Sequence, residues 1–165
     1  MSRITDRLPL LVTLMLVFFG VSAVAQSPSN LAARNKAIVL ERFNAWQAGI
    51  GSPFDLLAES ANWTIVGYSV VAKTYRGRAS FLSDVIEPFN ARMRERLKPS
   101  IREITADGDK VVILFDARAV ARDGKPYANT YAWFFEMHDG QVTDATAFFD
   151  SIEFNDLWQR VQPEL

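Results

Sequence analysis

Asp116 is the residue whose type and setting first suggest chemistry. It directly follows the apolar run Val111–Phe115, and a carboxylate beside such a run must be paired, hydrated or neutralised. In an apolar pocket, desolvation raises the pKa of a carboxyl group toward neutrality and suits it to general acid–base catalysis beside a carbonyl group. An ion pair with Arg118, two residues along the same strand face, would lower that pKa instead. We favour the ion pair, because structural pairs also perturb carboxyl groups.

A second group of candidates lies on the segment that follows Gly124. Alternate residues of a strand share one face, and one face here carries the larger amphipathic side chains: Tyr127, Asn129, Tyr131, Trp133 and Phe135. We expect this face to line a cavity for a flat or apolar ligand. The predicted ligand contacts are the walls Trp63, Tyr131 and Phe149 and the orienting groups Arg118 and Asn129. A bond from Asn129 to a backbone group is an equal alternative.

The remaining polar residues favour structural roles. Asp150 precedes a helix-like segment, so we expect it to be an N-cap, with Glu153 at the capping-box position. His138 is the only histidine and adjoins an Asp-Gly turn. Because cysteine is also absent, the sequence predicts no transition-metal site with ordinary ligands. With no glycine-rich phosphate loop either, we expect no cofactor.

Three Asp-Gly pairs organise the elements that must position these residues. They stand at Asp107-Gly108, Asp123-Gly124 and Asp139-Gly140, and Asp-Gly supplies the positive φ that tight hairpin turns need. They predict a four-stranded antiparallel meander with strands Ser100–Ala106, Lys110–Arg122, Pro126–His138 and Gln141–Phe149. Such long strands twist and curl, and we expect the curl to enclose a cavity.

The length of the turn at Asp123-Gly124 decides which face carries Asp116. A two-residue turn places Asp116 opposite Tyr131 and Arg118 opposite Asn129. A three-residue loop with a bulge shifts the pairing by one residue and turns Asp116 away. At the last turn a three-residue loop is expected, and it brings three residues to the face of Tyr131: Ala145, Ala147 and Phe149.

Helices and one short strand precede the meander. Apolar spacing predicts a helix over Leu31–Ala48 that ends at Gly49, and Ser52 and Pro53 open a short second helix. Asn62–Gly67 is strand-like because it is rich in β-branched and aromatic residues.

A third helix is predicted over Ala79–Leu97, kinked or split at Pro88. Its end carries a basic cluster, which we interpret as a solvated face that favours the helix dipole: Arg92, Arg94, Arg96 and Lys98. A last helix covers Ser151–Val161. The fold class is therefore α+β, with three or four helices on one face of a curved antiparallel sheet.

Composition and the N-terminus predict one exported domain. The net charge of −1, with 22% charged residues, favours no nucleic-acid partner. Arg3 and Arg7, the apolar run Leu10–Phe19 and the small residues Ala23-Val24-Ala25 predict a signal peptide over residues 1–25. An uncleaved anchor is the alternative. After cleavage near Ala25 we expect a linker at 26–30, one domain at 31–162, and a periplasmic or secreted protein without stable membrane insertion.

This layout resembles the SnoaL-like branch of the nuclear transport factor 2-like superfamily, which includes ketosteroid isomerases, limonene epoxide hydrolases and polyketide cyclases. The resemblance covers nearly all of the mature chain and rests on Ala61–Trp63, Thr74–Arg78, Gly124–Tyr131, Asp139–Val142 and Phe148–Ser151. It implies a cone-shaped fold with an apolar pocket and, often, a homodimer through the outer face of the sheet. It also favours the two-residue turn, because hydrolase-like relatives carry a pocket aspartate at the position that matches Asp116.

The resemblance implies cofactor-independent acid–base catalysis, of isomerase, cyclase or hydrolase type, on a small hydrophobic substrate, with Asp116 transferring the proton. The chain departs from the catalytic relatives, however. Leu114 replaces an arginine and Ala147 an aspartate of the epoxide hydrolases, and Phe43 and Trp46 stand where ketosteroid isomerases keep a tyrosine. The alternative is therefore a non-catalytic ligand-binding or dimerisation module on the same fold.

Overall fold

The structure, a computed structural model, describes residues 28–163, so the predicted signal peptide lies outside the described residues. These residues form a six-stranded sheet in the order β2-β1-β6-β5-β4-β3. The strands are β1 (Leu57–Ile65), β2 (Thr74–Arg76), β3 (Met93–Asp107), β4 (Lys110–Ala121), β5 (Pro126–His138) and β6 (Gln141–Phe149). Strands β3 to β6 are the predicted antiparallel meander, whereas β1 runs parallel to β6.

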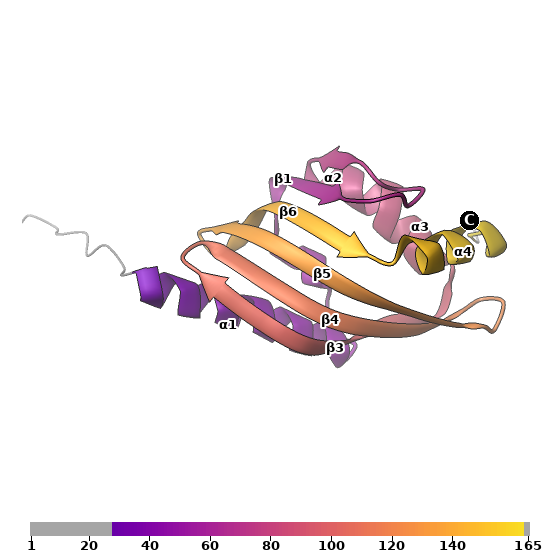
Figure 1. Ribbon diagram of the computed structural model, residues 1–165, viewed down its shortest axis with the longest axis horizontal. Coiled ribbons are helices and arrows are strands. Elements are labelled where there is room, and N and C mark those ends of the chain that lie inside the picture. The colour runs from indigo at the N-terminus through magenta and orange to yellow at the C-terminus, as the bar shows by residue number, and fades with distance from the viewer. Residues whose placement is uncertain (1–27, 164–165) are drawn as a thin grey trace, which may run out of the picture.

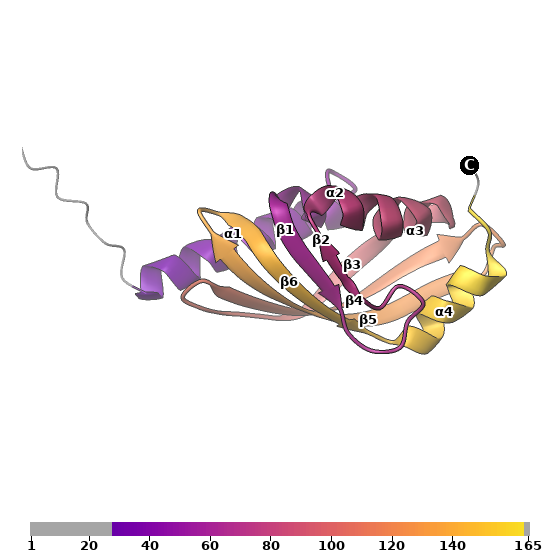
Figure 2. The same cartoon turned by 90° about the horizontal axis from the view of Figure 1, so that it is seen from above.

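The helices cover one face and one end of this curved sheet. They are α1 (Pro28–Gln47), the short 3-10 helix η1 (Pro53–Leu56), α2 (Arg78–Phe81), the π-helical turn η2 (Leu82–Ile86), α3 (Glu87–Ala91) and α4 (Ser151–Arg160). Figures 1 and 2 show α1 and the α2–α3 segment on the same side of the sheet, with α4 beyond the end of β6. The predicted α+β class is confirmed. None of the described helices is long and apolar enough to cross a membrane.

Two predicted boundaries near the helices are wrong. Helix α1 begins at Pro28, so residues 28–30 of the expected linker are helical. The third helix ends at Ala91, because β3 already begins at Met93. The predicted interruption by Pro88 is confirmed: a π-helical turn precedes α3, and Pro88 stands in the first turn of α3, where a missing N–H is tolerated.

A three-residue loop joins β4 to β5. Ala121 N donates to Lys125 O at 2.9 Å, and Gly124 N donates to Ala121 O at 2.9 Å. Gly124 closes this loop with a φ of 84°, a left-handed conformation that glycine adopts without steric cost. The two-residue turn that we expected here is therefore wrong.

The loop sets the register of β4 against β5. Asp116 pairs with Thr130 and Arg118 with Ala128, one residue away from the expected partners. Asp116 and Arg118 consequently lie on the outer face of the sheet, whereas Phe115 lies on the buried inner face.

The register of β5 and β6 agrees with the prediction. Tyr131 pairs with Phe149 and Trp133 with Ala147, so the three predicted β6 residues share the face of Tyr131. The expected three-residue loop is wrong, because the turn between His138 and Gln141 has two residues. The extra residue sits instead in a bulge near Thr143, where the pairing shifts between Val142 and Asp144.

Aromatic side chains form the core between the sheet and the helices. Trp133 is 5% exposed and meets three rings edge-on: Phe43 at 5.6 Å, Trp63 at 5.0 Å and Phe115 at 4.8 Å between centroids. Such contacts add to the free energy gained by burial.

We expect Trp133→Ala to lower the free energy of unfolding by roughly 3–5 kcal/mol, because the substitution removes buried surface and leaves a void. Urea unfolding followed by circular dichroism measures the change. Phe134→Ala is the control, since Phe134 is the next residue, lies on the outer face and is 43% exposed; its effect should be smaller. A loss below about 1 kcal/mol for Trp133→Ala contradicts a core position.

Candidate functional site

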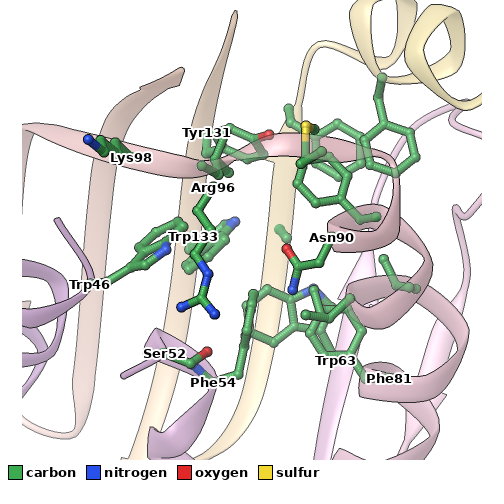
Figure 3. Close-up of a pocket in the computed structure, with 18 of the residues that line it drawn as sticks. Trp46, Ser52, Phe54, Trp63, Phe81, Asn90, Arg96, Lys98, Tyr131 and Trp133 are labelled. Carbon is green, nitrogen blue, oxygen red and sulfur yellow. The ribbon is translucent and has the colours of Figure 1, made fainter. Parts of the chain in front are cut away.

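A cavity of about 600 Å³ lies between the inner face of the sheet and the α2–α3 segment (Figure 3). Most of its wall is aromatic or aliphatic, and its aromatic residues include Trp46, Phe54, Trp63, Phe81, Tyr131 and Trp133. Concave apolar sites of this volume are typical of small-molecule binding.

Ring contacts hold the walls in place. Trp63 of β1 stacks on Phe81 of α2 with centroids 4.4 Å apart, and Trp46 of α1 lies parallel to Trp133 of β5 at 6.2 Å. Each pair joins two elements that are distant in the sequence. Packing between these rings therefore shapes the cavity wall.

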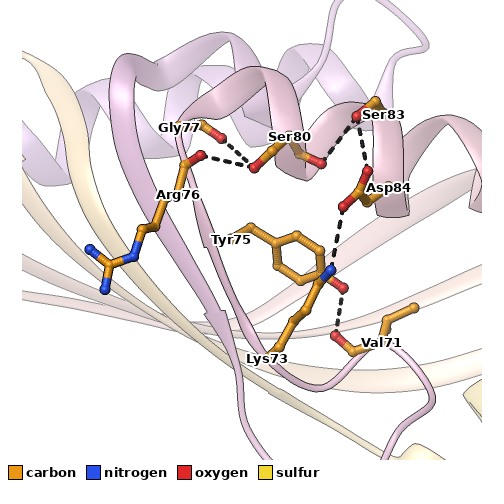
Figure 4. A network of polar contacts seen from close by, with 8 residues as sticks. All are labelled: Val71, Lys73, Tyr75, Arg76, Gly77, Ser80, Ser83 and Asp84. Carbon is orange, nitrogen blue, oxygen red and sulfur yellow. Dashed lines mark hydrogen bonds and ion pairs between the residues drawn. The ribbon is translucent and has the colours of Figure 1, made fainter.

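Polar contacts anchor the helical wall from outside the cavity (Figure 4). Lys73 Nζ lies 3.4 Å from Asp84 Oδ2 of the π-helical turn, and the Ser80 hydroxyl donates to the Arg76 carbonyl oxygen at 2.9 Å. The Tyr75 hydroxyl donates to the Val71 carbonyl oxygen at 2.7 Å. Burial, together with the charge of Asp84, raises the pKa of Tyr75, so this hydroxyl stays protonated.

Two tyrosine hydroxyls form a buried polar pair at one side of the cavity. Tyr131 Oη and Tyr127 Oη lie 2.8 Å apart, and Asn129 Nδ2 donates to Tyr127 Oη at 3.1 Å. Burial raises the pKa of Tyr127 to about 12 and that of Tyr131 well above its ordinary value. Both groups are therefore neutral at ordinary pH and serve as hydrogen-bonding groups.

Asn129 holds the start of α4. Its Oδ1 accepts from Asp150 N at 2.9 Å, and its Nδ2 donates to Asp150 O at 2.9 Å. The structure thus shows the backbone alternative for Asn129, which does not line the cavity. Asp150 caps α4 as predicted, with Oδ1 accepting from Ile152 N at 2.8 Å. The predicted capping box is wrong, because the Asp150 N–H bonds to Asn129 and leaves none for Glu153.

The structure separates the predicted site residues into two groups. Trp63, Tyr131 and Phe149 line the cavity, and their contact with a ligand stays a prediction. Asp116 and Arg118 lie on the outer face of the sheet, where they line a second, more polar depression. The predicted position of Asp116 in the pocket is therefore wrong, and the three-residue loop is the physical reason.

Asp116 is instead engaged in polar contacts on the outer face. Its carboxylate accepts from Thr130 Oγ1 at 2.7 Å and from Arg102 Nε at 2.7 Å. The hydrogen bonds from Thr130 and Arg102, with the charges of Arg102 and Arg118, hold the pKa of Asp116 below its ordinary value, although partial desolvation opposes them. The expected structural ion pair exists, but its partner is Arg102 from β3 and not Arg118.

Neither His138 nor a carboxylate cluster offers another reactive site in residues 28–163. The imidazole of His138 is 81% exposed and lies 3.3 Å from Asp139 in the turn. The described part of the chain places no three His, Cys, Asp or Glu side chains where they could hold a metal ion.

The basic residues at the cavity were missed as site residues. Arg94, Arg96 and Lys98 line it from β3, because the strand begins where we expected the helix to continue. Their two-residue spacing is the period of a strand. This spacing was the signal in the sequence that could have placed them on a strand.

Comparison with known proteins agrees with this geometry. The family model described as the SnoaL-like domain matches residues 39–145. The chain belongs to the SnoaL-like family. This SnoaL-like domain has the fold of the nuclear transport factor 2-like superfamily. No curated protein matches its sequence.

Solved structures show the same fold at low sequence identity. Bal32a, from a soil-derived mobile gene cassette, is 23% identical with a TM-score of 0.64, and the match covers 78% of this chain and 99% of Bal32a. PrhC from Penicillium brasilianum NBRC 6234 is 17% identical with a TM-score of 0.66, over 79% and 89% of the two chains. A proposed SnoaL-like polyketide cyclase from Jannaschia sp. CCS1 is 20% identical with a TM-score of 0.60, over 82% and 99%.

The outer-face ion pair leads to a prediction on pH dependence. Because the pKa of Asp116 is lowered in the folded state, its contribution to stability is present above the unfolded pKa of about 3.9 and is lost as pH falls through the folded value. We expect the free energy of unfolding of Asp116→Asn to fall less steeply between about pH 4 and pH 2 than that of the wild type. Urea unfolding at several pH values measures both slopes.

Asp109→Asn is the matched control, since Asp109 is exposed and its side chain has no ion pair among the described residues. Equal slopes for Asp116→Asn and the wild type would show that the bonds to Thr130 and Arg102 do not form in solution.

Proposed function

We propose that this SnoaL-like domain binds a small hydrophobic molecule in the cavity between the sheet and the α2–α3 segment. The observation that carries the proposal is the cavity of about 600 Å³, whose described lining includes no aspartate, glutamate or histidine. An apolar wall with few polar groups favours retention of a ligand through burial of apolar surface.

The same lining argues against acid–base catalysis in the cavity. A general acid or base works best with a pKa near the operating pH, and carboxyl and imidazole groups are the usual sources of such a pKa. Asp116, the base that the sequence suggested, lies outside the cavity. Tyr131 has its pKa raised further from neutrality, so its hydroxyl suits hydrogen bonding to a ligand. We therefore prefer the binding module to the isomerase, cyclase or hydrolase.

A relative with the same fold has been studied with a small molecule. TerC, which is 17% identical with a TM-score of 0.62 over 76% of this chain and 98% of TerC, was co-crystallised with polyporic acid. This precedent supports a small organic ligand as the class of partner for the present chain.

Filling the cavity tests the proposal. Ala147 is on the inner face of β6 and lines the cavity, so we expect Ala147→Leu to weaken binding of the neutral apolar probe N-phenyl-1-naphthylamine at least about tenfold by occupying its volume. Titration of the probe's fluorescence measures the dissociation constant. Thermal unfolding confirms that the variant is folded.

The control is Thr146→Leu, which adds a leucine on the outer face of the same strand and should leave binding unchanged. The proposal fails if the wild type does not bind the probe, or if Ala147→Leu binds it as tightly as the wild type does.

We also propose export and self-association for this domain. The charged start, apolar run and small residues over 1–25 support cleavage near Ala25. The outer face of β5 and β6 exposes Phe134 at 43% and Phe148 at 44%, with ring centroids 5.8 Å apart. Neighbouring exposed rings support an interface with a second copy.

Native mass spectrometry of the full chain expressed in a bacterial host tests both. We expect a periplasmic protein whose protomer begins at Gln26 and which is a dimer, with Phe134→Glu shifting it to a monomer. A protomer that keeps residues 1–25 contradicts cleavage, and a wild-type monomer contradicts the dimer.

A further inference from the structure

Cations, and no acidic residue, line the open side of the cavity. Six of the residues that line the cavity are exposed and mark this side: Gly49, Gly51, Asn90, Arg94, Arg96 and Lys98. Three of them are cations, and none of the described lining residues is acidic. A charge of one sign beside low-dielectric walls focuses the field at the opening.

Arg96 is the cation whose side chain projects from β3 over the cavity. Glu95 pairs with Val120 and Lys98 with Arg118, so three steps along β3 match two steps along β4. This bulge breaks the alternation of the strand and redirects the side chain at its centre. Figure 3 shows Arg96 projecting from β3 in the direction of Ser52, whereas Lys98 points away from the aromatic wall.

The guanidinium of Arg96 has no partner among the described residues. No hydrogen bond, ion pair or cation–π contact in residues 28–163 involves it. The nearby carboxylates are engaged elsewhere: Glu95 lies 3.8 Å from Arg94, and Asp55 accepts from Ser52 N at 3.0 Å. An arginine without a partner at the opening of an apolar cavity has its planar set of donors available for an oxyanion.

Resting on the proposed function, we propose that the ligand of this domain is an amphipathic organic anion, with its apolar body in the cavity and a carboxylate or similar oxyanion bound by Arg96 at the opening. Ser52 flanks the same opening, and its hydroxyl hydrogen can donate to the anion while its oxygen accepts from Phe54 N at 3.2 Å. Lys98 and Arg94 add long-range attraction.

A pair of probes that differ by one anionic group tests this. 1-Anilinonaphthalene-8-sulfonate is N-phenyl-1-naphthylamine with an added sulfonate, so the ratio of their dissociation constants isolates the charged contact. We expect the wild type to bind the sulfonate about tenfold more tightly than the neutral probe, as charge-assisted hydrogen bonds imply. Arg96→Gln should remove this preference and leave the affinity for the neutral probe unchanged, and Arg96→Lys should keep part of it.

Arg76→Gln is the matched control, because Arg76 is an exposed arginine of β2 outside the cavity lining. It removes the same charge and should leave both affinities unchanged. If the neutral probe binds but the sulfonate gains nothing, or if Arg96→Gln keeps the wild-type ratio, the anionic ligand is ruled out while the proposed function stands. If neither probe binds the wild type, both proposals fall.

Discussion

The left-handed backbone of Gly124 sets the register of β4 against β5. That register decides that the interior beside the cavity is apolar. The three-residue loop places Asp116 and Arg118 on the outer face and leaves Phe115 beside Tyr131, with their rings stacked at 5.0 Å. Because side chains alternate along a strand, a shift of one residue would exchange these two faces. One turn therefore keeps the carboxylate out of the apolar interior.

The aromatic side chains of the wall stabilise the core and also leave the cavity open. Trp63 and Trp133 are nearly buried and pack against each other, yet each also presents part of its ring to the cavity. Rings held by several neighbours resist collapse into the space beside them, since core side chains occupy well-defined rotamers. The contacts that stabilise the fold are thus the same contacts that shape the cavity.

The family resemblance suggested a carboxylate inside the cavity, whereas the structure places that carboxylate outside and cations at the cavity. The carboxylate of Asp116 is bound by Thr130 and Arg102 on the outer face, and the charged residues that line the cavity are all cationic. This arrangement supports the proposed selection of a ligand by charge and shape. The described lining of the cavity includes no carboxylate and no imidazole group.

The amino-acid sequence by itself determined the elements whose formation depends on neighbours along the chain. The three Asp-Gly turns, the interruption at Pro88 and the cap at Asp150 all follow from local backbone chemistry, and from them the α+β fold could be predicted. So could the inner face of β5, because alternation along one strand identifies it without knowledge of its partners.

Only the tertiary structure decided which strand faces point inward together and where α3 ends and β3 begins. Two- and three-residue turns are both compatible with Asp123-Gly124. They differ in which residues of β4 and β5 they pair, and those pairs are contacts between strands. Residues 92–98 satisfy a helical and a strand pattern alike, and pairing with β4 resolves the choice in favour of the strand. The position of Asp116 was therefore mispredicted and Arg96 was missed, because side-chain placement in a sheet depends on long-range pairing.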